Sequence, residues 1–100
     1  MPPEKLAQLD PVIHSRTRLG VLSILVSVKE ASFNYLKETI GTTDGNLSVS
    51  LSRLEEAGYI SIKKAFKGKK PLTTCRISEK GKKAFSEYIK ALETYTGFKK

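Results

Sequence analysis

The chain has 100 residues, 39 % of them hydrophobic and 28 % charged, which is typical of one folded domain and unlike a disordered chain. The longest mostly apolar run, Val21 to Val28, is far shorter than the roughly 18 to 20 residues that cross a bilayer. The amino terminus lacks the basic and apolar regions of a signal peptide, so we expect a cytoplasmic protein that does not bind membrane. A single cysteine, Cys75, and a single histidine, His14, exclude intramolecular disulfides and Cys/His zinc clusters, and neither has an evident catalytic partner. We therefore expect no metal, no cofactor and no enzymatic activity.

The net charge of +8 is concentrated in the second part of the chain. Residues 1–60 carry six basic and seven acidic side chains, whereas residues 61–100 carry twelve basic and three acidic ones. Such an asymmetry indicates a surface that faces a negatively charged partner, and the phosphate backbone of nucleic acid is the commonest one. The alternative is a solvated basic surface that only keeps the protein soluble.

A first helix is predicted over residues 11–29. Asp10 suits an N-cap and Pro11 the first helical position, although a break near Ser15 is compatible with the sequence. Apolar side chains cover more than one face of this helix, and a core of this size can hardly bury them all. These side chains form two neighbouring stripes, Leu19, Leu22 and Val26 on one and Val21, Leu25 and Val28 on the other.

The next two helices form a helix-turn-helix. Ser32 can cap a helix over residues 32–40. A third helix is predicted over residues 43–57, capped by Thr43, because leucines recur at helical spacing at positions 47, 51 and 54. The connection between the two helices is short and contains glycine, as in a helix-turn-helix.

A hairpin and a last helix follow. Apolar residues alternate with polar ones on either side of a turn from Lys67 to Pro71, so residues 59–78 are predicted to form two strands. Ser78 can cap a last helix over residues 79–95. An apolar stripe runs along that helix and consists of Phe85, Tyr88, Leu92 and Tyr95. Residues 1–100 thus form one α+β, mainly helical domain.

A helix-turn-helix that is followed at once by a hairpin is a winged helix-turn-helix, in which the second helix of the pair fits a major groove and the hairpin, or wing, reaches the flanking backbone. On the outward face of the third helix, Asn46 can bond adenine bidentately, Val49 can meet a thymine methyl, and Arg53 can reach guanine or phosphate. Ser48 and Ser50 flank this face. Thr43 and the first free amides of the helix offer a phosphate site.

The wing carries a dense cluster of positive charge. Five lysines lie within eight residues, a density that fold chemistry does not require, and we expect them to contact phosphates. These residues are Lys63, Lys64, Lys67, Lys69 and Lys70.

Two segments of the chain resemble a known family. They are Leu54-Glu55-Glu56-Ala57-Gly58-Tyr59-Ile60, at the end of the third helix, and Ile77-Ser78-Glu79-Lys80-Gly81, after the wing. With them, the chain from about Asp10 to Leu92 resembles archaeal and bacterial winged-helix regulators related to the MarR and ArsR groups. The resemblance implies a homodimer whose interface is formed by the first and last helices. The side chains expected in that interface are Val21, Leu25, Val28, Phe85, Tyr88, Leu92 and Tyr95.

We therefore predict a regulator that binds double-stranded DNA as a homodimer at an inverted repeat. The alternative is a protein-interaction or assembly module, because winged helices also serve that purpose. Binding of double-stranded RNA is less favoured, since the A-form major groove is too narrow for a helix. The sequence marks no pocket for a small-molecule effector.

Overall fold

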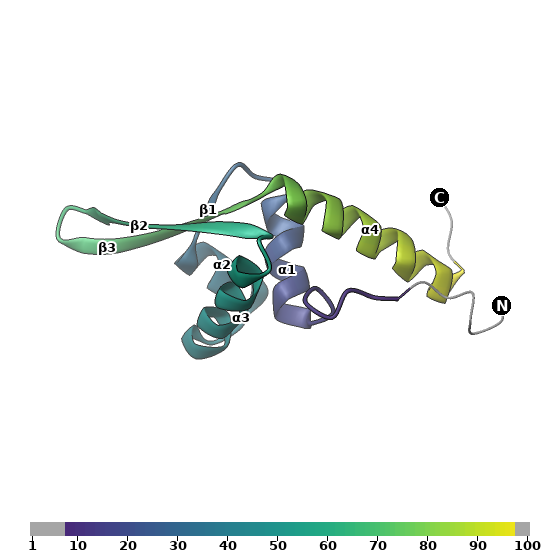
Figure 1. Cartoon of the computed structure of the whole chain (residues 1–100). Helices are drawn as coiled ribbons and strands as arrows, with labels where there is room; N and C mark the ends of the chain where they lie inside the picture. Colours follow the sequence, from purple (N-terminus) through teal and green to yellow (C-terminus); the bar gives the residue numbers. More distant parts are fainter. Residues whose placement is uncertain (1–7, 98–100) are drawn as a thin grey trace.

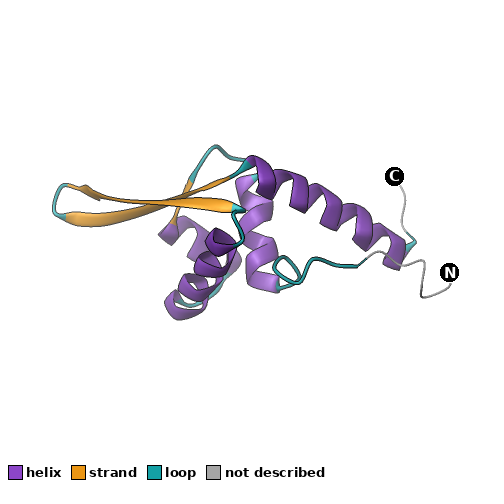
Figure 2. Ribbon diagram, viewed as in Figure 1, coloured by secondary structure: helices purple, strands orange, loops and turns teal. Residues whose placement is uncertain are grey.

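Three helices form a body from which a two-stranded hairpin and a fourth helix extend in opposite directions (Figure 1). The computed structural model describes residues 8–97, and its extents are 56 × 25 × 25 Å. The elements are α1 (Arg16–Leu25), β1 (Ala31–Ser32), α2 (Phe33–Ile40), α3 (Asp44–Glu56), β2 (Ile60–Lys67), β3 (Lys70–Ile77) and α4 (Glu79–Thr96). Figure 2 shows that the helices and strands follow one another in the predicted order, with β1 as an addition.

Helix α1 is shorter than predicted, and the range 11–29 is wrong at both ends. Ser15, in extended conformation, is its N-cap and accepts a hydrogen bond from the backbone N–H of Arg18. Asp10 instead closes a separate turn, in which its carboxylate accepts from Val12 N–H and its carbonyl accepts from His14 N–H. The helix ends at Leu25, and residues 26–30 connect it to β1.

Two tyrosines, one just before β2 and one in α4, form hydrogen bonds with the segment before α1. The Tyr59 hydroxyl donates to Asp10 Oδ2, and the Tyr88 hydroxyl lies 2.9 Å from His14 Nδ1. Burial, reinforced by the hydrogen bond to Asp10, raises the pKa of Tyr59 to about 12. Tyr59 is therefore a protonated donor at neutral pH.

The helix-turn-helix forms as predicted. Ser32 caps α2, and Gly41 ends that helix in the left-handed conformation at φ 76°. Thr43 caps α3, and its hydroxyl accepts from Asn46 N–H at 3.1 Å. A Lys37–Asp44 ion pair of 2.8 Å links the two helices across the turn.

The sheet has three antiparallel strands in the order β1-β3-β2. Ala31 pairs with Cys75 and Ser32 with Thr74, a contact that sequence periodicity could not predict because β1 has only two residues. The turn between β2 and β3 is tighter than the predicted span, because Lys67 pairs with Lys70 and only two residues connect them. Gly68 supplies the positive φ, 67°, that such a hairpin needs.

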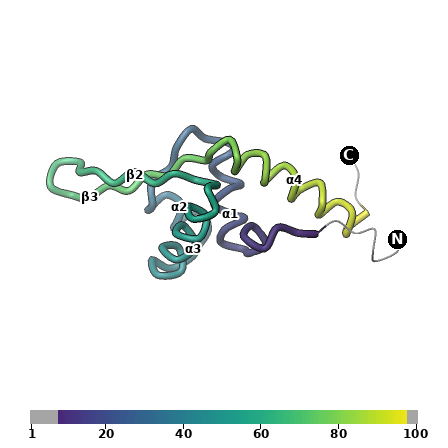
Figure 3. The backbone as a smooth tube through the Cα atoms, in the orientation of Figure 1, coloured from purple at the N-terminus to yellow at the C-terminus, as the bar shows by residue number. Residues whose placement is uncertain are grey.

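The core lies where α1, α2, α3 and the body end of the sheet meet. Its fully buried side chains come from every one of these elements. They include Ile13, Val21, Leu22, Leu25, Leu36, Leu47, Leu54 and Cys75. Beyond Ile62 every residue of β2 is exposed, so the outer part of the hairpin stands free of the body (Figure 3).

The start of α4 is held against the turn between α3 and β2 by contacts with the backbone of that turn. Ser78 N–H donates to the Tyr59 carbonyl at 2.9 Å, and Ser78 Oγ donates to the Gly58 carbonyl while it accepts from Gly81 N–H. A Cβ atom on Gly81 would lie 2.1 Å from the Tyr59 carbonyl oxygen. Gly81 is therefore needed for the close approach of two backbones, and this contact joins the two segments that carry the family resemblance.

We expect Gly81→Ala to destabilise the domain by about 3 kcal/mol or more, because backbone cannot yield to the added methyl as a flexible side chain would. Urea unfolding followed by circular dichroism measures the loss. Gly45→Ala is the matched control, since its Cβ would meet no atom within 4 Å, and it should leave stability unchanged or slightly raised. Equal stability of both variants would refute the close-approach explanation.

Candidate nucleic-acid interface

Helix α3 presents an exposed face opposite its buried leucines. Leu47, Leu51 and Leu54 are buried as predicted. Val49 is 62 % exposed, and Ser48 and Arg53 are also exposed. These three side chains are thus available to a ligand that lies against the helix.

Ser50 was predicted to flank this face, and that prediction is wrong. Its side chain is only 3 % exposed because, one turn before Leu54, it lies on the core side of α3. Ser50 therefore does not contribute to the outward surface.

The structure gives Asn46 a role inside the domain. Its amide nitrogen donates to the hydroxyl of Thr42 at 3.0 Å and to the hydroxyl of Thr17 at 3.4 Å. Both amide protons are thereby used, so the predicted bidentate bond to adenine, which needs one of them, conflicts with this geometry. The Thr42–Asn46 spacing of one helical turn was readable in the sequence, but the approach of Thr17 from α1 was not.

The remaining predicted contacts of α3 lie at its two ends. Thr43 is exposed at the positive end of the helix dipole, next to the Lys37–Asp44 ion pair. Lys37, which is not among the predicted site residues, is held beside the start of α3 by this ion pair. At the other end, burial and the nearby charge of Arg53 lower the pKa of Arg18, so Arg53 has a second cation close to it.

All five wing lysines are exposed, and the strand register distributes them over both faces of the hairpin. Lys64 pairs with Thr73, on the face that also carries Ile62 and is called here the inner face. Lys63, Lys67 and Lys70 lie on the opposite, outer face, and Lys69 lies in the turn.

Lys67 and Lys70 stand directly opposite each other. Like charges in this position destabilise a strand pair. No acidic residue occurs anywhere between Glu56 and Glu79, so no carboxylate of the hairpin itself neutralises them. These opposed charges destabilise the isolated wing, and an anionic partner would neutralise them.

A hollow of about 180 Å³ separates α3 from the inner face of the wing. It brings serine and threonine hydroxyls close to one lysine, a combination suited to a phosphate backbone. Its lining residues are Phe33, Ser48, Leu51, Ser52, Ile62, Lys64 and Thr73.

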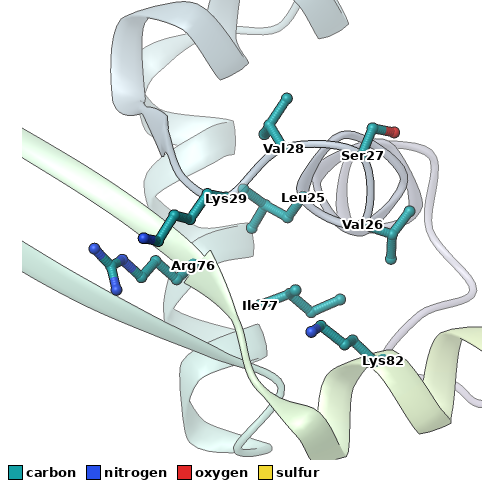
Figure 4. A pocket seen from close by; sticks show the side chains of 8 residues that line it. All are labelled: Leu25, Val26, Ser27, Val28, Lys29, Arg76, Ile77 and Lys82. Carbon is teal, nitrogen blue, oxygen red and sulfur yellow. The ribbon is translucent and has the colours of Figure 1, made fainter.

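A second, larger hollow of about 420 Å³ lies away from this surface, between the end of α1, the end of β3 and the start of α4 (Figure 4). Two of the three cations that line it are already paired, since Arg76 bonds Glu30 at 2.8 Å and Lys82 bonds Glu79 at 3.2 Å, whereas Lys29 belongs to no ion pair among the described residues. The hollow therefore offers a ligand only one uncompensated cation.

Neither Cys75 nor His14 belongs to a cluster of catalytic or metal-binding side chains among the described residues. Cys75 is fully buried, and burial raises its pKa to about 11, so its thiol is protonated and shielded at neutral pH. Within residues 8–97, no cluster of His, Cys, Asp and Glu could hold a metal ion, and no helix is long and apolar enough to span a membrane.

Three of the predicted dimer contacts are wrong. Val21 and Leu25 are 0 % and 1 % exposed, and Tyr88 is 3 % exposed, because they fill the core of the single chain. Tyr95 is 48 % exposed, while Phe85 and Leu92 are partly buried along α4. Val28 is exposed but lies in the turn after α1 rather than in the helix.

The helix-turn-helix and basic hairpin define a winged helix domain, and comparison with known proteins agrees. A family model described as a winged helix DNA-binding domain matches residues 17–96. The chain therefore belongs to the winged helix DNA-binding domain family, which is non-enzymatic, and the predicted resemblance to winged-helix regulators is confirmed.

Individual relatives cover most of the chain. An uncharacterized protein of Methanocaldococcus jannaschii is 38 % identical over 78 residues, which are 78 % of this chain and 85 % of that protein. A transcriptional regulator homologue from Pyrococcus horikoshii has the same fold, with a TM-score of 0.78 and 22 % identity over 86 % of this chain and 85 % of that one. The M. tuberculosis regulator MosR, solved in complex with DNA, has a TM-score of 0.68 and 14 % identity over 86 % of this chain and 61 % of its own.

The hydrogen bonds of Asn46 predict that Asn46→Ala lowers the free energy of unfolding by about 1 kcal/mol, because the Thr17 and Thr42 hydroxyls lose their shared donor. Ser52→Ala, on the exposed side of the same helix, should change it by less than about 0.5 kcal/mol. Urea denaturation of both variants measures the difference. An unchanged stability in Asn46→Ala would mean that the amide does not hold α3 to α1.

Proposed function

We propose that this protein is a sequence-specific transcriptional regulator that inserts α3 into a major groove and holds the flanking backbone with its wing. The observation that carries the proposal is the wing itself, in which Lys67 faces Lys70 across the strands and no acidic residue compensates them. Phosphates supply the missing counter-charge. Such a role would be carried out in the cytoplasm, where a bacterial or archaeal chromosome lies.

The outward side chains of α3 divide into base and phosphate contacts. Val49 meets a thymine methyl, and Arg53 reaches guanine or phosphate. Thr43 bonds a phosphate beside the free amides at the start of the helix, and Ser48 bonds a second phosphate further along it. Asn46 aligns the helix, and only its Oδ1 is free to accept a bond from a base.

The lysine contribution is tested by selecting binding sites from random duplex DNA and titrating salt on the best site. Lys67/Lys69/Lys70→Ala should flatten the log-log salt slope by roughly 0.9 for each phosphate that the variant no longer neutralises. Lys82/Lys83/Lys90→Ala on α4 removes the same charge elsewhere and should leave the slope nearly unchanged. If the wild type prefers no duplex over random DNA, the winged helix serves another partner and the assembly-module alternative takes its place.

We also propose that two copies pair through the outer part of α4 and bind an inverted repeat. Tyr95 is exposed on the half of α4 that projects away from the body, in line with the partly buried Phe85 and Leu92 (Figure 1). A two-fold dimer requires half-sites about one helical turn, or about 34 to 36 Å, apart.

Tyr95→Asp should convert the dimer to a monomer, because it buries a charge in an apolar interface. Sedimentation equilibrium at micromolar concentration measures the mass. Tyr35→Asp, at an exposed tyrosine of α2, is the control and should stay dimeric. A monomeric wild type would refute pairing through α4.

A further inference from the structure

A large apolar side chain lies exposed at the tip of the wing. Phe66 is 75 % exposed, more than any other large apolar residue among those that the structure describes. It pairs with Pro71, one step before the Lys67–Lys70 pair and the two-residue turn. The core does not use this ring, because β2 is exposed from Lys63 onward.

The register fixes the side to which the ring points. Residues two apart on a strand share a face, so Phe66 lies on the inner face with Lys64 and Ile62. Ile62 and Lys64 line the hollow against α3. Phe66 therefore points to the same side of the wing as α3, which is the side that a bound duplex would occupy.

Charge decides which partner suits this ring. Lys64 shares its face, while Lys67 and Lys70 on the outer face and Lys69 in the turn lie at the same end of the hairpin. An apolar protein surface would have to cover these lysines without neutralising them, at a high desolvation cost. A duplex offers phosphates to the lysines and stacked bases to the ring, so it satisfies both.

The length of the wing places the ring one groove away from α3. Strands rise about 3.4 Å per residue, so Phe66, the fourth residue beyond Ile62, lies about 14 Å further along the hairpin. This is a little less than half of the roughly 34 Å helical turn of B-DNA, so the ring lies about one groove further along a duplex than the hollow against α3.

We infer that Phe66 is a wedge that enters the minor groove beside each half-site and partly unstacks one base step. This inference rests on the proposed function. Apolar side chains act in this way in proteins that bind the minor groove, and unstacking costs least at flexible pyrimidine–purine steps. Phe66 thus adds a preference for a flexible flanking step to the bases that α3 reads.

The test uses the full chain and duplexes that carry the selected site with either TA or AA at the flank, and with 2-aminopurine next to that step. Wild type should raise the 2-aminopurine fluorescence and bind the TA duplex more tightly than the AA duplex. Phe66→Ala should abolish both effects and weaken binding to the TA duplex by roughly 5- to 100-fold. Its salt slope should stay that of wild type, because no charge is removed.

Leu72→Ala is the matched control, since Leu72 lies on the outer face of the same hairpin and is 37 % exposed. It should retain the fluorescence change and the TA preference. Wild-type behaviour of Phe66→Ala on a duplex that the protein binds specifically would overturn the wedge and leave the proposed function intact. A change in self-association instead of DNA binding would also overturn it, whereas absence of any specific duplex would refute the proposed function first.

Discussion

The close approach of α4 to the turn between α3 and β2 is the contact on which the rest of the architecture depends. Gly81 brings the first turn of α4 against the Tyr59 carbonyl, and Ser78 donates to the carbonyls of Gly58 and Tyr59 while it accepts from Gly81 N–H. Because β2 begins at Ile60 and β3 ends at Ile77, this single junction closes both the base of the wing and the start of α4. It thereby sets the directions in which the two projecting elements leave the body.

The base of the wing contributes to the stability of the domain, whereas its tip does not. The hairpin is held at its base by buried apolar residues, whereas its tip combines opposed lysines with an exposed phenylalanine. Neither feature stabilises an isolated domain, since like charges repel and an exposed ring gains nothing from burial. Both become favourable against a surface that is anionic at its rim and apolar in its grooves, as a duplex is.

Polar contacts, and not only buried leucines, fix the position of α3 in the domain. Its leucines face the core, but its first turn is positioned by the Thr43 cap, the Lys37–Asp44 ion pair and the bonds of Asn46 to Thr17 and Thr42. These contacts come from α1, from α2 and from the turn. A rigid first turn helps a reading helix, because ordering it on binding would cost conformational entropy.

Local signals in the sequence determined most of the elements and the charge of the candidate interface. Caps at Ser32, Thr43 and Ser78, leucine spacing and period-two alternation each depend on near neighbours, so they were readable without the fold. Tertiary structure alone decided what depends on distant residues. It placed β1 beside β3, turned Ser50 inward and enclosed Val21, Leu25 and Tyr88 in the core of one chain. An apolar stripe looks the same in sequence whether it packs within a chain or against a partner. The amide of Asn46 likewise looks free in the sequence, because only the fold brings the Thr17 hydroxyl close enough to accept from it.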